Sequence, residues 1–193
     1  MTYNPLIHRR RSIRLFGFDY SQPGCYFITI CVHEKKCILG KIINNKVVLN
    51  NLGQVIEDEW LNTEKIRRNI KIDKFVVMPN HVHGIIVIKA DNQGVWPYHN
   101  ENSCRGVWQY APTDELNTIN NFDSPSQSIG SIIRGFKSIT TKKINIIRQT
   151  SKTPVWQRNY YEHIIRDEND YLRIVNYIQN NPDKWQFDGN YKT

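Results

Sequence analysis

The stretch FVVMPNHVHGIIVI, at residues 75–88, decides the fold of this chain. The sequence is apolar and rich in β-branched side chains on both sides of Pro79-Asn80, which predicts strands over 70–78 and 81–88. A break of two residues leaves room only for a short connection. The two strands are therefore expected to be neighbours in an antiparallel sheet.

The segments on either side of this pair also show strand and helix patterns. Asn44-Asn45, between two short β-branched runs, is typical of a tight hairpin turn. Apolar residues at three- and four-residue steps predict helices, the last of them capped by Asp167. The remaining expected elements are strands at 25–32, 38–43, 47–49 and 156–165 and helices at 51–68, from 128 onward, and from 167 to 180 or 181. This order predicts an α+β fold, with one antiparallel sheet and helices packed on it.

Length and composition indicate one globular domain with a polyanionic partner. The chain has 193 residues, 39% of them hydrophobic, which is enough for a single domain over 1–193. Lysine and arginine outnumber aspartate and glutamate by 26 to 18, and the formal charge of +8 favours nucleic acid as the partner. No stretch approaches the roughly 20 apolar residues of a membrane span, so we expect no membrane partner and a cytoplasmic protein.

Two basic segments are candidates for DNA contact. Residues 1–18 form a predicted basic N-terminal arm, and the helix from 128 carries basic side chains mostly away from its apolar face. The candidate DNA-binding residues are Arg9, Arg10, Arg11, Arg14, Arg134 and Lys137. A solvated surface is the alternative for both segments. Residues from about 91 to 127 lack periodicity and are predicted to be a loop insertion.

His81 and His83 are the first candidates for a chemical site. Side chains in a strand alternate between its faces, so both imidazoles are expected on one face, at the centre of the sheet. Two polar rings there each need a partner, and a divalent cation satisfies both. The pair alone is weak evidence, because histidines at this spacing also occur as structural or surface residues.

The last predicted helix supplies candidate partners for the two histidines. Tyr177 and Asn181 are four residues apart, so they project from the same side of the helix. Asn181 can complete a metal site with His81 and His83, and Tyr177 can hold a nucleophilic oxygen near it. The alternatives are packing for Tyr177 and a helix-stop role for Asn181 before Pro182.

Three motifs, taken together and in this order, resemble a known family. They are MPNHVHG at 78–84, WQRNYYEHIIRD at 156–167 and YIQNNP at 177–182. The sequence resembles the single-tyrosine HUH transposases, and most closely their REP-associated tyrosine transposase branch, over about residues 14–186. The resemblance implies a ferredoxin-like or RRM-like HUH endonuclease fold.

The resemblance also implies a reaction. It implies a transposase that cuts and rejoins single-stranded DNA near hairpins, such as REP-like palindromes, through a 5′-phosphotyrosine. Tyr177 matches the nucleophile, and His81, His83 and Asn181 match the ligands of a divalent metal, Mg²⁺ or Mn²⁺. The branch favours a monomer over a dimer.

Several alternatives remain open. A binding module with the same fold would bind structured single-stranded DNA or RNA without cutting it. A zinc hydrolase is disfavoured, because no HExxH motif or third strong ligand is spaced nearby. Tyr160 or Tyr161, beside His163, can replace Tyr177 as the nucleophile, although their place in a predicted strand favours packing.

Overall fold

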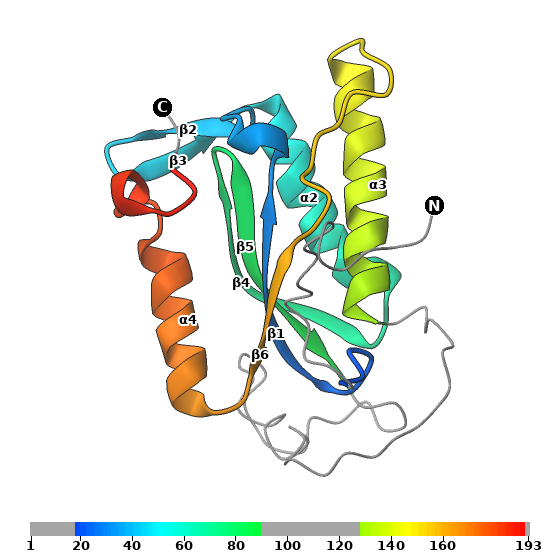
Figure 1. Cartoon of the computed structure of the whole chain (residues 1–193), viewed down its shortest axis with the longest axis vertical. Helices are drawn as coiled ribbons and strands as arrows, with labels where there is room; N and C mark the ends of the chain where they lie inside the picture. Colours follow the sequence, from blue (N-terminus) through cyan, green and yellow to red (C-terminus); the bar gives the residue numbers. More distant parts are fainter. Residues whose placement is uncertain (1–17, 90–127, 192–193) are drawn as a thin grey trace, which may run out of the picture.

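The computed structural model describes residues 18–89 and 128–191 and confirms the α+β fold (Figure 1). Its elements are β1 (Gly24–Cys31), η1 (His33–Lys35), β2 (Gly40–Ile43), β3 (Lys46–Leu49), α2 (Asn51–Ile66), β4 (Ile70–Met78), β5 (His81–Ile88), α3 (Ile129–Ile147), β6 (Tyr161–Ile165), α4 (Glu168–Asn180) and η4 (Trp185–Phe187). Apart from Phe18, the predicted arm over 1–18 lies outside the described residues, and so does the predicted insertion over 91–127.

The main sheet contains four antiparallel strands in the order β4-β5-β1-β6. β5 and β1 form its central pair, and their register places His83 opposite Thr29 and His81 opposite Cys31. β6 pairs with β1 and forms one edge of the sheet. The histidine pair therefore lies at the centre of the sheet, as the sequence predicts.

β2 and β3 form a separate two-stranded sheet beside the main one. Both edges of β1 are already paired, with β5 and β6, so the hairpin cannot join the sheet next to it. The predicted turn is confirmed, because Asn44 and Asn45 have φ angles of 50° and 60°. Positive φ at both positions is what a two-residue hairpin turn requires.

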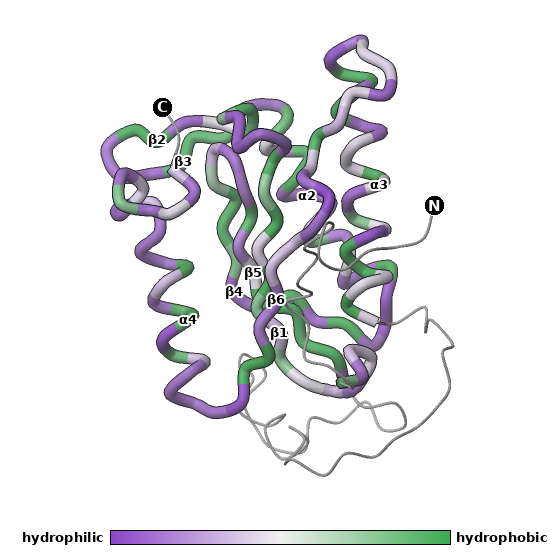
Figure 2. Tube along the Cα trace, viewed as in Figure 1, coloured by the Kyte–Doolittle hydropathy of each residue, from purple (hydrophilic) through white to green (hydrophobic). Residues whose placement is uncertain are grey.

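Helices cover the two faces of the main sheet unequally (Figure 1). α2 and α3 pack on one face, where Trp60 and Phe136 belong to the larger buried cluster. α4 packs on the opposite face through Tyr171, Ile174 and Ile178. Figure 2 shows hydrophobic residues along the central strands and alternating colours along α4, the pattern of an amphipathic helix. One helix is too narrow to cover four strands, so α4 leaves part of this face of the sheet available for a site.

Gly84 faces the covered side of the sheet, opposite to its neighbour His83. A Cβ at this position would lie 2.5 Å from the Trp60 ring and 3.1 Å from the Cβ of Phe75. Trp60 is 1% exposed and has no free space into which it can move. Gly84 therefore allows α2 to approach β5.

The element ends differ in detail from the prediction. Trp156 forms an isolated bridge with Val32, and the strand predicted from residue 156 begins only at Tyr161. Asp167 caps α4 as predicted, because its Oδ1 accepts from the backbone N–H of Asp170 at 2.9 Å. In the part of the chain that the structure describes, no helix combines the length and the apolar character needed to cross a membrane.

Candidate metal and tyrosine site

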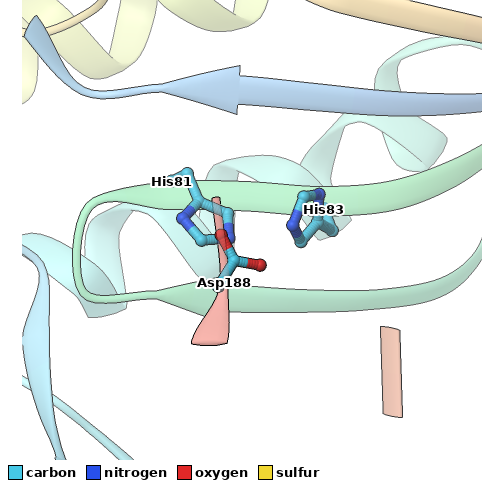
Figure 3. Close-up of side chains that lie close together, drawn as sticks. All are labelled: His81, His83 and Asp188. Carbon is cyan, nitrogen blue, oxygen red and sulfur yellow. The ribbon is translucent and has the colours of Figure 1, made fainter. Parts of the chain in front are cut away.

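Two histidines and an aspartate meet on the face of the sheet that α4 partly covers. His81 and His83 are buried on β5, and Asp188 directly follows η4. One ligand atom of each residue lies within 4.8 Å of those of the other two (Figure 3). Two imidazole nitrogens and a carboxylate oxygen suit a first-row divalent metal. The predicted histidine pair thus gains a third candidate ligand.

A hydrogen bond fixes the orientation of each imidazole. The Nδ1 atom of His81 lies 2.8 Å from Oδ1 of Asn80, and the Nδ1 atom of His83 lies 2.8 Å from Oγ1 of Thr29. Asn80 donates from Nδ2 to two backbone carbonyls, so its Oδ1 accepts and the Nδ1 atom of His81 carries the proton. The Nε2 atom of His81 is buried, with no hydrogen-bond partner within residues 18–89 and 128–191. A buried nitrogen lone pair without a partner is what a metal ligand offers.

Burial keeps both imidazoles neutral. Burial lowers the pKa of His81 to about 4, although the negative charge of Asp188 opposes this shift. Burial also lowers the pKa of His83 well below its ordinary value, and the neighbouring His81 adds to the effect. The neutral imidazole is the form that binds a metal, so the pair is ready for one at neutral pH.

The lowered pKa of His81 makes stability depend on pH. The pKa of an unfolded histidine is about 6.5 and that of folded His81 is about 4. The unfolded state therefore binds more protons at pH values between these two. With EDTA present, we expect the free energy of unfolding to fall as the pH drops from about 6.5 to 4, by about 3 kcal/mol from His81. Urea unfolding of wild type and His81→Gln at pH 7 and pH 4 measures this. An equal pH effect in both proteins would contradict the assignment.

α4 brings Tyr177 and Asn181 to the same cluster. The Tyr177 hydroxyl lies 3.1 Å from Nε2 of His83 and donates to Oδ2 of Asp188 at 3.1 Å. Asn181 donates from Nδ2 to the same carboxylate oxygen at 2.8 Å, and its buried Oδ1 has no hydrogen-bond partner in the described parts of the chain. The structure therefore brings together the four predicted residues His81, His83, Tyr177 and Asn181.

Tyr177 is protonated and donates to a carboxylate. Burial raises the pKa of Tyr177, and the negative charge of Asp188 raises it further. Burial also raises the pKa of Asp188, but hydrogen bonds from Asn181 and from the backbone N–H of Asn190 outweigh burial and lower it overall. The phenol thus has a proton acceptor in place, although by itself it is a weak nucleophile at neutral pH.

Asp188 is the site residue that the sequence did not predict. It follows α4 in a segment without strand or helix periodicity, so no spacing rule links it to the histidines. Tertiary contacts set its position: Asn80 donates from Nδ2 to the carbonyl of Asn190 at 2.8 Å, and the Trp185 ring lies 5.8 Å from the His81 ring. These contacts exist only once the chain has folded.

Asn80 holds both the His81 ring and the segment that carries Asp188. Asn80→Ala removes both contacts. Asn80→Asp keeps a side-chain oxygen that accepts from His81 but loses the N–H groups that donate to the carbonyls of Lys35 and Asn190. We expect Mn²⁺ affinity to fall about 10- to 100-fold in Asn80→Ala and less in Asn80→Asp. Hydrogen exchange over residues 185–191 should rise in both variants. Calorimetric titration with Mn²⁺ measures the first effect, and an unchanged affinity in Asn80→Ala would show that Asn80 does not orient the ligand.

Of the predicted DNA-binding residues, the structure describes Arg134 and Lys137, and neither belongs to this cluster. Arg134 is exposed on α3. Lys137 is partly buried, and its Nζ donates to the carbonyls of Gln157 and Asn159, both at 2.9 Å. Burial lowers the pKa of Lys137 to about 8. The arginines Arg9, Arg10, Arg11 and Arg14 lie outside the described residues.

The alternative tyrosines line a cleft. Tyr160, Tyr161 and His163 line this cleft, which opens beside Tyr177. The Tyr177 hydroxyl is hydrogen bonded to two members of the candidate metal cluster, His83 and Asp188. Tyr177 is therefore in direct contact with the place where a metal would lie.

Comparisons with known proteins find a relative in sequence and solved structures that are similar in fold. No protein-family model matches the chain. A protein of Haemophilus influenzae, described only as uncharacterized, is 45% identical over 187 residues, which cover 96% of this chain and 95% of that protein. The solved structure of a REP-associated tyrosine transposase bound to a REP hairpin matches with a TM-score of 0.58 and 19% identity, over 93% of this chain and 76% of that chain.

A second solved structure, a transposase candidate from Deinococcus radiodurans, matches with a TM-score of 0.45 and 11% identity, over 88% of this chain and 97% of that chain. The likeness to the hairpin-bound transposase confirms the predicted HUH fold, with its antiparallel sheet and helices. The chain belongs to the same family as the Haemophilus influenzae protein and has the fold of a REP-associated tyrosine transposase.

Proposed function

We propose that this chain is a metal-dependent transposase that cuts and rejoins single-stranded DNA near hairpins, with Tyr177 as the nucleophile. One observation carries the proposal: the Tyr177 hydroxyl lies 3.1 Å from both His83 Nε2 and Asp188 Oδ2, inside the candidate metal cluster. A phenol oxygen beside a bis-histidine and carboxylate site fits phosphoryl transfer to tyrosine.

The residues of the site fit a divalent metal. His81 Nε2 and Asn181 Oδ1 are buried polar atoms without hydrogen-bond partners among the described residues, and a cation satisfies both. His81, His83 and Asp188 would hold it, with the amide oxygen of Asn181 as a further ligand. Imidazole nitrogens favour Mn²⁺ over the harder Mg²⁺. When bound, the metal supplies positive charge that polarises the scissile phosphate and favours the ionised form of the phenol.

The side chains of the site supply the remaining steps. The Tyr177 oxygen attacks the phosphorus atom, the bond from phosphorus to the 3′ oxygen breaks, and the strand ends as a free 3′-hydroxyl and a 5′-phosphotyrosine. Asp188 Oδ2 accepts the hydrogen bond of the Tyr177 hydroxyl and can take its proton, and the departing 3′ oxygen takes up a proton in turn. Attack by a 3′-hydroxyl on the phosphotyrosine reverses the step. One phosphodiester replaces another, so rejoining needs no nucleotide cofactor.

The proposed substrate is a single-stranded DNA hairpin with its flanking strand, bound by a monomer. The solved transposase of the same fold is bound to a REP hairpin. The formal charge of +8 supports a polyanionic substrate of this kind. Selection of binders from a pool of hairpins enriches the sequence that the protein recognises.

A covalent-adduct assay tests the proposed function. A labelled pool of hairpin-containing single-stranded DNA is incubated with the protein and Mn²⁺, Mg²⁺ or EDTA and then separated on a denaturing gel. We expect a protein–DNA band that depends on the metal and is strongest with Mn²⁺. Tight binding of the enriched hairpins without a covalent band in any metal would instead support a binding module.

A further inference from the structure

A cleft of about 650 Å³ opens directly beside Tyr177. It lies between α4 and the part of the sheet face that includes the edge strand β6, and Gln157, Asn159 and Tyr160 contribute to its lining. The volume is within the range of about 300–1,000 Å³ that is typical of small-molecule sites. A group bound there would therefore be about as large as one nucleotide and would lie next to the proposed nucleophile.

The floor of the cleft is aromatic. Tyr161 on β6 is 45% exposed, and its ring lies 6.2 Å from that of Phe27, at an interplanar angle of 68°. Phe27 also contacts the Tyr177 ring edge-to-face, at 6.1 Å between centroids. Phe27 is 7% exposed, so it supports the two tyrosines while Tyr161 remains open to a ligand. An accessible aromatic ring on a sheet surface is a stacking surface for an unpaired base.

One wall of the cleft contains Gln157 and Asn159, whose backbone is held by hydrogen bonds. Gln157 donates its backbone N–H to the carbonyl of Cys31 at 2.9 Å, and Lys137 binds the carbonyls of Gln157 and Asn159. The segment therefore cannot move freely. Gln157 and Asn159 line the cleft, and a side-chain amide can both donate to and accept from the edge of a base.

A cation lies on the helix side of the cleft. Arg173 is one turn before Tyr177 on α4, and its side chain is 71% exposed. It is paired with Asp170, whose other carboxylate oxygen lies 2.6 Å from Nε2 of His163. Asp170 thus orients the guanidinium, and the remaining N–H groups of Arg173 can bind a phosphate.

We propose that this cleft binds one unpaired nucleotide that adjoins the scissile bond, with its base against Tyr161 and its phosphate near Arg173. The inference deepens the proposed function, because it names the part of the DNA that enters beside the nucleophile. It requires the cut to fall in unpaired DNA, since a base held in a duplex cannot stack on Tyr161.

Short oligonucleotides test the cleft without any cleavage. Fluorescein-labelled dT5 and an abasic strand of the same backbone length are titrated in EDTA against wild type, Tyr161→Leu and Tyr161→Phe. We expect wild type to bind dT5 about 5- to 150-fold more tightly than the abasic strand, Tyr161→Phe to keep this ratio, and Tyr161→Leu to remove it. Gln157→Ala should change the relative affinities for dT5, dA5 and dC5.

Two results would overturn the inference. One is equal affinity of wild type for dT5 and the abasic strand, and the other is an unchanged ratio in Tyr161→Leu. Photocrosslinking of wild type with a 5-iododeoxyuridine pentamer gives a second readout, which should map to Tyr161 and needs no variant to fold. The result is separable from the proposed function. Selective binding of dT5 by a protein that forms no covalent adduct would support nucleotide binding in the cleft and contradict the proposed transposase activity.

Discussion

Tyr177→Phe is expected to abolish the covalent protein–DNA band, with a loss of strand cleavage of at least about a thousandfold. The substitution removes only the hydroxyl. The Phe ring keeps the contacts of Tyr177 with Phe27 and with His83, whose centroid lies 5.0 Å away. Asp188 still accepts from Asn181 and from the backbone of Asn190, so its position is retained. Hairpin affinity should therefore stay within about twofold of wild type.

The matched controls are Tyr160→Phe and Tyr161→Phe, which remove a hydroxyl from the two other tyrosines of the cleft. Both should still form the adduct. Mass spectrometry of the digested wild-type adduct should place the nucleotide on the peptide that contains Tyr177. An adduct that persists in Tyr177→Phe and disappears in one of the two controls would show that the tyrosine replaced in that control is the nucleophile.

His83→Gln is expected to reduce Mn²⁺ affinity by more than about 100-fold and cleavage in proportion. Glutamine fills much of the volume of the imidazole, so the buried centre of the sheet stays packed. It does not place a nitrogen lone pair where His83 Nε2 now faces Tyr177 and Asp188. Without that ligand the metal would have to be held by His81 and Asp188, with the Asn181 amide.

Calorimetry or the Mn²⁺ electron paramagnetic resonance signal measures this affinity without any DNA. The matched control is His163→Gln, because His163 lies in the same cleft but pairs with Asp170 instead of with the metal cluster. It should bind Mn²⁺ like wild type. Equal affinities in His83→Gln and wild type would mean that the bis-histidine pair is not a metal site.

Local spacing was sufficient to predict most of the elements and part of the site. The two-residue period puts His81 and His83 on one face, and the four-residue step puts Tyr177 and Asn181 on one side of α4. Each relation depends on geometry within one strand or one helix. The same is true of the Asn44-Asn45 turn, where both residues have the positive φ that a two-residue hairpin turn requires.

Features that depend on long-range contacts were not predicted. Asp188 reaches the histidines through packing of a segment that has no period of its own. Lys137 is a basic residue of the kind that binds phosphate, yet in the fold its Nζ points inward and donates to two backbone carbonyls. β2 and β3 form a separate sheet instead of joining the main one, and no local pattern in the sequence expresses this separation.

The contact between Gly84 and Trp60 has a consequence for how the motif HVHG should be used to search for related proteins. Its two histidines face the candidate metal cluster, whereas Val82 and Gly84 face the packed helices on the other side of the sheet. The motif therefore combines two independent requirements. The histidines serve the candidate metal site, and the glycine allows the close approach of the Trp60 indole. A relative with a smaller residue at position 60 can lose the glycine and keep both histidines, so a search that demands the whole motif would miss it.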